Sequence, residues 1–191
     1  MLVTELDHRV KNLLSRVTAV VSATRRQSAS VDEYATALNG RIASLLDAHV
    51  LMGQSAGVSL SVLARRQFAP YAALGNTTLA GPDVTLLPDA AEALAMTLHK
   101  LVTNAAKYGA LSATGGQVTI QWRRDLDGTL CVNWREIGGP AIDGQPKPDY
   151  GMCLIRDLIP HELAGRVELQ FSPSAVDCTM NIPAKFVDWA R

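Results

Sequence analysis

The first part of the chain contains no glycine or proline between Thr4 and about Arg26. Apolar residues recur within it at steps of three and four, the spacing that lines one face of an α-helix. These residues are Leu6, Val10, Leu13, Leu14, Val17 and Val21. The pattern predicts one long amphipathic helix, which must bury its apolar face against another element.

A second helix is predicted from Ser30 to about Met52. Ser30 and Glu33 have the spacing of a capping box, in which the two side chains satisfy free N–H groups at the helix start. The apolar positions of this helix are Tyr34, Leu38, Ile42, Leu45, His49 and Met52. Together the two segments predict an antiparallel helical hairpin.

The apolar face of each predicted helix is too wide to be covered by the other helix alone, since such a face spans roughly 100° or more. A second copy of the hairpin would complete a four-helix bundle, so we predict a homodimer formed through the N-terminal hairpin. The alternative is that the hairpin packs on the rest of the chain, and the composition does not separate the two.

The remainder predicts a separate α+β domain, with helices on one face of a mixed or antiparallel sheet. We expect a first domain at residues 1–55 and a second at 56–191, joined near Gly53–Gly57. Helices are predicted at 59–68, 88–109 and 152–163, and strands at 77–80, 84–87, 118–124, 129–136, 166–171 and 178–182. Pro88 opens the second of these helices, Gly109 ends it, and Asp127-Gly128 predicts a hairpin turn.

Charge and composition exclude several classes of protein. The chain has 18 Lys and Arg and 18 Asp and Glu, so it lacks the basic surplus that nucleic-acid and membrane-surface binding require. Arg16, Arg25 and Arg26 interrupt the first apolar segment, and the three cysteines are far apart. We expect a cytoplasmic protein with buried, free cysteines and no nucleic-acid or membrane partner.

Three groups of residues are candidates for chemistry. His8 lies nearly opposite the apolar face of its helix, beside Asn12, and is either surface or a reactive group offered to another domain. Asn104 shares one sector of its helix with Lys100 and Lys107. The asparagine oxygen suits Mg²⁺ and a lysine suits a phosphate, although an ordinary solvated helix flank has the same pattern.

The third group follows the strand predicted at 129–136. A carboxylate at Glu136 can accept hydrogen bonds from an exocyclic amine, and the glycines after it permit close approach of a ligand to the backbone. These are Gly138 and Gly139. Gly151 directly precedes a predicted helix, whose free N–H groups favour an anion. A strand-end turn and an ordinary helix start are the alternatives.

Four segments in this order resemble the HWE family of bacterial sensor histidine kinases. They are His8-Arg-Val-Lys-Asn-Leu-Leu14, Thr103-Asn-Ala-Ala-Lys-Tyr-Gly-Ala-Leu-Ser112, Trp134-Arg-Glu-Ile-Gly-Gly-Pro140 and Tyr150-Gly-Met-Cys-Leu-Ile155. The family is named after a histidine and a Trp-x-Glu motif, which match His99, Trp134 and Glu136. The resemblance implies a dimerisation and histidine phosphotransfer hairpin, followed by an ATP-binding domain with the gyrase-like α/β-sandwich fold.

The resemblance also implies roles for single residues. His8 would accept a phosphoryl group from Mg-ATP and pass it to an aspartate on the receiver domain of a response regulator. Asn104 would bind Mg²⁺, Lys107 would contact a phosphate, and Glu136 would bind adenine. The glycines that would shape the nucleotide pocket are Gly138, Gly139 and Gly151. Asn12 would position a water molecule or the regulator, and we assign His99 no role in metal binding.

Two positions depart from the family pattern. Lys100 stands where the family usually has glutamate, and Asp149 stands where a glycine is common. Both changes weaken the expectation of strong kinase activity. The alternative is a phosphotransfer relay protein with a degenerate ATP-binding domain, and a third reading is a non-catalytic dimeric scaffold. We recognise no sensory domain, so the input signal is expected to act from elsewhere.

Overall fold

The structure is a computed structural model of the 191-residue chain. It describes residues 17–18, 21–22, 24–25, 30–31, 34–35, 38–40, 42, 57–142 and 150–189. The chain forms two compact units, residues 1–46 and 47–191. The predicted domain boundary after residue 55 stays a prediction, because residues 43–56 lie outside the described part.

Every described residue from 17 to 25 and from 31 to 42 is helical, in agreement with the two helices predicted there. The backbone N–H of Tyr34 donates to the carbonyl of Ser30 at 3.0 Å, so the second helix begins where the capping pattern predicts. His8, Asn12 and His49 lie outside the described residues. The dimer likewise stays a prediction.

The second unit is built on a five-stranded mixed sheet with the order β2-β4-β5-β7-β6. These strands are β2 (Thr77–Ala80), β4 (Gln117–Arg124), β5 (Leu130–Ile137), β6 (Arg166–Ser172) and β7 (Ala175–Ile182). β2 runs parallel to β4, and the other pairs are antiparallel.

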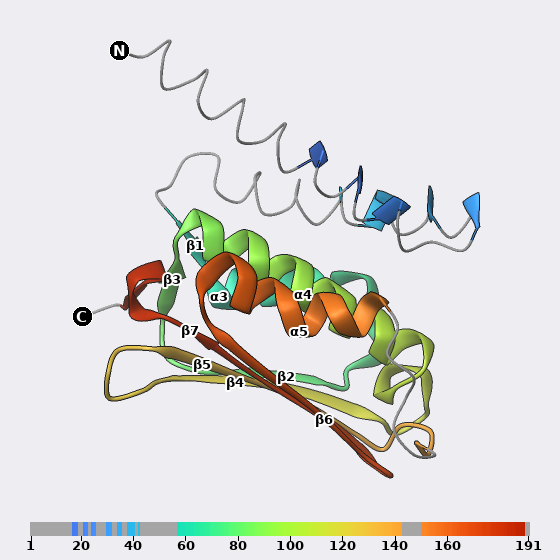
Figure 1. The fold of residues 1–191 in the computed structure, drawn as a ribbon. Helices are drawn as coiled ribbons and strands as arrows, with labels where there is room; N and C mark the ends of the chain where they lie inside the picture. The colour runs from blue at the N-terminus through green and yellow to red at the C-terminus, as the bar shows by residue number, and fades with distance from the viewer. Residues whose placement is uncertain are drawn as a thin grey trace. The chain divides into compact units, whose positions relative to one another are not determined.

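Three helices cover one face of this sheet (Figure 1). They are α3 (Leu60–Phe68), α4 (Pro88–Lys107) and α5 (Tyr150–Leu163). The α+β architecture with helices on one face is confirmed. Among the described residues, no helix combines the length and apolar character needed to cross a membrane.

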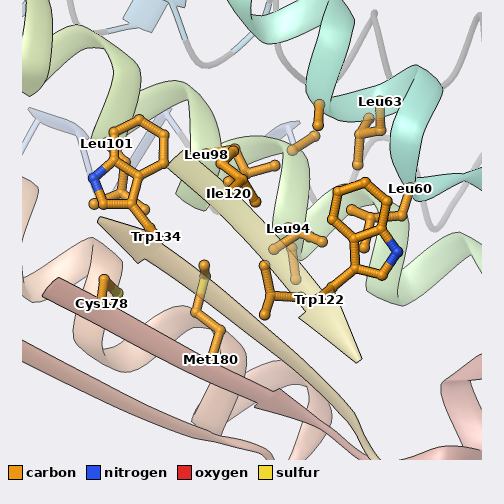
Figure 2. Packing of buried hydrophobic residues seen from close by; sticks show 14 of the residues in the cluster. Leu60, Leu63, Leu94, Leu98, Leu101, Ile120, Trp122, Trp134, Cys178 and Met180 are labelled. Atoms are coloured by element: carbon orange, nitrogen blue, oxygen red, sulfur yellow. The ribbon is translucent and has the colours of Figure 1, made fainter. Parts of the chain in front are cut away.

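The core lies between α4 and the central strands. Alternate residues of β4 point toward the helices and are buried, as Figure 2 shows for Ile120 and Trp122. They meet the apolar face of α4, including Leu94 and Leu98, which are fully buried. Burying each such side chain stabilises the fold by roughly 1.5–3 kcal/mol, so this contact anchors α4 on the sheet.

A second, three-stranded sheet has the order β1-β3-β8, with β1 at Val58–Ser59, β3 at Val84–Leu86 and β8 at Val187–Trp189. Of these strands only β3 is predicted from the sequence. Strands of two or three residues are too short to show an alternating pattern. Short 3₁₀ helices, also not predicted, occupy Ala69–Leu74 (η1), Ala110–Ser112 (η2) and Ala184–Phe186 (η3).

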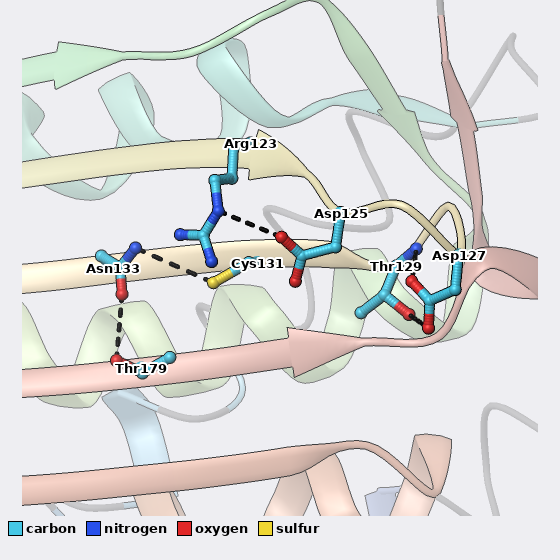
Figure 3. A network of polar contacts seen from close by, with 7 residues as sticks. All are labelled: Arg123, Asp125, Asp127, Thr129, Cys131, Asn133 and Thr179. Carbon is cyan, nitrogen blue, oxygen red and sulfur yellow. Dashed lines mark hydrogen bonds and ion pairs between the residues drawn. The ribbon is translucent and has the colours of Figure 1, made fainter.

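The predicted hairpin between β4 and β5 is confirmed. Gly128 has φ +85°, a left-handed conformation that favours glycine, and the Asp127 carboxylate accepts hydrogen bonds from the N–H and hydroxyl of Thr129 (Figure 3). Away from the helices, β5 and β7 are joined by a hydrogen bond from Thr179 Oγ1 to Asn133 Oδ1 at 2.9 Å. This face of the sheet is therefore polar.

The three cysteines are free, but they are not all buried as predicted. Cys131 and Cys178 are buried, and burial raises the pKa of the Cys178 thiol to about 12. Cys153 is exposed on α5, so the prediction was wrong for this residue. It was based on residue type alone, whereas position 153 falls on the face of α5 that points away from the core.

Candidate functional site

A cavity of about 330 Å³ is bounded by α4, η2, β5, α5, β6 and β7. The residues that line it are Leu101, Asn104, Tyr108, Gly109, Ala110, Glu136, Gly139, Pro140, Ala141, Ile142, Met152, Ile155, Leu169, Phe171, Ser174, Ala175 and Val176. Most are apolar. Glu136 is the only acidic or basic side chain among these described residues, so the cavity suits a largely apolar group with a hydrogen-bond donor.

Glu136 lies near the end of β5, opposite Val176 of β7, and is only 5% exposed. Its Oε1 accepts a hydrogen bond from Trp134 Nε1 and its Oε2 accepts one from the backbone N–H of Ala110, both at 3.0 Å. Burial raises the pKa of Glu136 above 4.5, its ordinary value, and outweighs the two hydrogen bonds, which lower it. Because each carboxylate oxygen can accept more than one hydrogen bond, Glu136 can still accept from a ligand.

Gly109 is glycine for a different reason from the one predicted. Helix α4 ends at Lys107, and Gly109 has φ −111°, so no left-handed cap is present. Instead, a Cβ at Gly109 would overlap with Oε2 of Glu136 and lie 2.9 Å from Cα of Ala105. The missing side chain therefore lets the Glu136 carboxylate reach the Ala110 N–H.

The structure brings three of the predicted site residues to the cavity: Asn104, Glu136 and Gly139. Gly139 packs on η2, because a Cβ there would lie 2.9 Å from the backbone nitrogen of Ala110. Gly138 has φ +72° in the turn that follows β5 and packs beside Gly115, so it shapes the turn and does not line the cavity.

Lys107 and Gly151 also lie outside the cavity lining. Lys107 is exposed at the end of α4. Gly151 is buried in the first turn of α5, where the Lys100 side chain covers it: a Cβ at Gly151 would overlap with Lys100 Cε and lie 2.6 Å from Nζ. Lys100 thus spans from α4 to the start of α5. His99 does not line the cavity, and Asp149 lies outside the described residues.

The apolar walls of the cavity were not predicted from the sequence. Phe171 and Val176 come from the last two strands of the five-stranded sheet and Ile142 from the loop after β5, and none of them stands in a recognisable motif. Tyr108 and Gly109 also line the cavity, and they could have been found because they directly follow the Asn104 segment.

The donor set fits a nucleotide with its metal ion better than a metal ion alone. In the described part of the chain, no three His, Cys, Asp or Glu side chains stand close enough to hold a metal. Asn104 supplies one amide oxygen. Since Mg²⁺ prefers oxygen ligands and keeps waters and phosphates in its coordination shell, it would bind here only together with a phosphate ligand.

Comparison with known proteins identifies the family. The model of the HWE histidine kinase family matches residues 5–83. Blue-light-activated histidine kinase 1 of Erythrobacter litoralis is 33% identical over 188 residues, which are 94% of this chain and 52% of that protein. The chain belongs to the HWE histidine kinase family. The blue-light-activated histidine kinase of Rhizobium johnstonii is 30% identical, over 96% of this chain and 53% of its own length.

This HWE-family chain thus spans about half the length of these curated relatives. Solved structures agree on the fold. The Erythrobacter litoralis EL346 blue-light-activated histidine kinase matches 94% of the chain and 60% of that structure, with a TM-score of 0.67 and 17% identity. The catalytic domain of histidine kinase ThkA matches 66% of the chain and 94% of that domain, with a TM-score of 0.51. The predicted α/β-sandwich fold is therefore confirmed.

Proposed function

We propose that the chain is the kinase core of a two-component signalling protein, which binds Mg-ATP in the cavity and phosphorylates its own His8. One observation carries the proposal: the Glu136 carboxylate and the Asn104 amide, from motifs 32 positions apart in the chain, line the same apolar cavity. A carboxylate can accept from the amino group of adenine and an amide oxygen can bind Mg²⁺, so the pair suits an adenine nucleotide with its metal ion.

The adenine base would lie against the apolar walls, with its exocyclic amino group donating to Glu136. Leu101, Ile155 and Phe171 supply part of these walls from α4, α5 and β6. Excluding water from a buried carboxylate strengthens a hydrogen bond that it accepts. This contact would select a base that carries an amino donor.

The phosphates would lie toward Asn104 and the start of α5. Asn104 would hold Mg²⁺, which when bound neutralises charge on the phosphates. Lys100 reaches the first turn of α5 and Lys107 stands at the exposed end of α4, so both lysines would contact phosphate oxygens. Gly151 leaves the room that the Lys100 side chain fills.

His8 would act as the nucleophile. A neutral imidazole nitrogen attacks the γ-phosphorus in line with the bond to the leaving ADP oxygen; the N–P bond forms as that P–O bond breaks, and the imidazole gives its proton to solvent. Near its ordinary pKa of about 6.5, a histidine is half neutral. Asn12 would position a water molecule or the acceptor protein.

The phosphoryl group would pass from His8 to an aspartate of a response regulator. Histidine kinase ThkA, whose structure in complex with response regulator protein TrrA resembles this chain with a TM-score of 0.51, supports such a partner. The predicted homodimer would form through the N-terminal hairpin and supply the surface that the regulator binds.

A relay protein without ATP binding is the second candidate function. The observation that favours it is the position of Lys100, whose side chain spans from α4 to the start of α5 near the proposed phosphate site. Its ammonium group would repel Mg²⁺ there. In that case His8 would only exchange phosphoryl groups with receiver domains.

Incubation with γ-labelled ATP and Mg²⁺ tests the proposal. We expect the wild-type chain to acquire label that is lost in acid and kept in alkali, as expected for a phosphohistidine, and to bind ADP in calorimetry. If the chain binds no nucleotide but takes label from a phosphorylated receiver domain, the relay function is correct and the kinase proposal is wrong.

The pH dependence of ADP binding provides a second test. Because burial raises the pKa of Glu136 and an ionised carboxylate accepts a hydrogen bond from adenine more strongly than a protonated one does, ADP affinity should fall as the pH drops through that raised pKa. We expect affinity to be about tenfold lower once Glu136 is fully protonated than when it is fully ionised, the worth of one hydrogen bond to a charged group. Calorimetry at each pH measures it.

The Glu136→Gln variant is the matched control, because protonation of ADP itself affects its binding to both proteins equally. In the absence of nucleotide, ionisation of Glu136 lowers the free energy of unfolding, whereas it raises the affinity for ADP. The folded chain holds the Glu136 proton more tightly than the unfolded chain, so this residue's contribution to the free energy of unfolding is greatest below pH 4.5 and is lost as the pH rises through the raised pKa. An ADP affinity with the same pH profile in both proteins would contradict Glu136 as the adenine contact.

A further inference from the structure

Trp134 is held on two sides within the core. Its ring stacks on Phe68 at the end of α3, with centroids 5.7 Å apart and an angle of 8° between the planes. Its indole nitrogen donates to Glu136 Oε1 at 3.0 Å. Trp134 is 1% exposed, so its N–H is shielded from bulk water.

The Glu136 carboxylate is therefore fixed by two donors that belong to different elements. Trp134 Nε1 on β5 holds Oε1, and the Ala110 N–H of η2 holds Oε2. Gly109 leaves the space for Oε2. Two donors on two oxygens determine the plane of a carboxylate and so determine where its remaining lone pairs point.

We propose that Trp134 is a positioning residue for nucleotide selection: its indole N–H holds Glu136 ionised and oriented, so that the cavity accepts a base with an exocyclic amino donor and rejects one with a carbonyl at that place. This inference rests on the proposed binding of ATP in the cavity. Trp134 does not line the cavity itself and acts only through Glu136.

The selection follows from the charge on Glu136. An ionised carboxylate has only acceptors, so it attracts the amino group of adenine and repels the carbonyl oxygen of guanine. A carboxyl group that has lost one of its donors gains a proton more easily. In that form its O–H can donate to a carbonyl, and the distinction between the two bases becomes smaller.

Trp122 provides a matched control within the same sheet. It is also buried, at 6% exposure, and its Nε1 also donates a hydrogen bond, to the carbonyl of Pro82 at 2.7 Å. It does not line the cavity and has no contact with Glu136 among the interactions of the described residues. Trp122→Phe therefore removes the same atoms from the core and leaves the carboxylate untouched.

The experiment compares the binding of ADP and GDP to the full chain by calorimetry. We expect Trp134→Phe to weaken ADP binding about tenfold, the worth of a hydrogen bond to a charged group. GDP binding should stay the same or become tighter. Trp122→Phe should keep both affinities within about twofold of the wild-type values, since it leaves the Glu136 hydrogen bonds in place.

A second variant removes the N–H alone. β-(3-Benzothienyl)alanine at position 134 has the shape of tryptophan with sulfur in place of the N–H, so it keeps the stack on Phe68 and should fold as the wild-type chain does. It should lower the ratio of ADP to GDP affinity as Trp134→Phe does. An unchanged ratio in this protein overturns the inference.

The failure of the inference differs from the failure of the proposed function. A wild-type chain that binds no adenine nucleotide contradicts the proposed function. If Glu136→Gln weakens ADP binding but the benzothienyl protein binds ADP and GDP like the wild-type chain, ATP binding stands and the role of Trp134 is wrong. An equal loss of ADP affinity in Trp122→Phe and Trp134→Phe would also overturn it, since it would point to general destabilisation.

Discussion

We expect the chain with His8→Ala to take up no detectable acid-labile label from γ-labelled Mg-ATP and to keep the wild-type affinity for ADP. Alanine has no nucleophilic atom, so the N–P bond cannot form at this position. The cavity belongs to the second unit of the chain, residues 47–191, and keeps its lining. We therefore expect the substitution to abolish labelling and to leave nucleotide binding unchanged. Both quantities are measured on the same preparation.

His161→Ala is the control for this experiment. His161 is exposed near the end of α5 and does not line the cavity, so the variant removes one imidazole without touching the proposed chemistry. It should take up label at the wild-type rate. Label that persists in His8→Ala would show that another residue accepts the phosphoryl group. Loss of label in both variants would point to a general effect on the protein.

The second large effect is expected from Asn104→Ala. This change removes the amide oxygen that would hold Mg²⁺, and enzymatic phosphoryl transfer depends almost entirely on positioning and charge neutralisation. We expect the labelling rate to fall by about a hundredfold or more, the range seen when one stabilising contact is removed from an active site. ADP binding in the absence of Mg²⁺ should change little, because the base contact at Glu136 remains.

Asn133→Ala is the matched control for Asn104. Asn133 lies on the polar face of the sheet, bonded to Thr179, and does not line the cavity. Its loss should lower the free energy of unfolding by about 1 kcal/mol and leave the labelling rate unchanged. A labelling rate that is unaffected in Asn104→Ala would rule out this residue as the metal ligand.

Local patterns predicted the elements of the second unit well. Pro88 at the start of α4 and Asp127-Gly128 between β4 and β5 are signals that act within a few residues, and both predictions are confirmed. The described residues of the two N-terminal segments are helical for the same reason, a sustained apolar period. By contrast, β1 and β8 owe their structure to hydrogen bonds with β3, which lies far from β8 in the sequence.

In the candidate site, too, local sequence patterns predicted some features and contacts between distant residues decided others. The residue types of Asn104, Glu136 and Gly139 indicated their chemistry, and the resemblance to a family joined them into one proposal. The sequence predicted no contact between Trp134, Ala110 and the Glu136 carboxylate. Nor did it show that Gly109 makes room for an oxygen atom from another strand, since a glycine after a helix has a simpler local explanation.

By itself, the sequence determined the main helices of the second unit and the hairpin between β4 and β5, because periodicity and turn chemistry depend only on neighbouring residues. The order of its motifs along the chain indicated the family. The tertiary structure alone decided which side chains enclose the cavity and how the Glu136 carboxylate is held. Those features depend on strand order and on the packing of α4, α5 and η2 against the sheet, where atoms separated by tens of residues come within hydrogen-bonding distance.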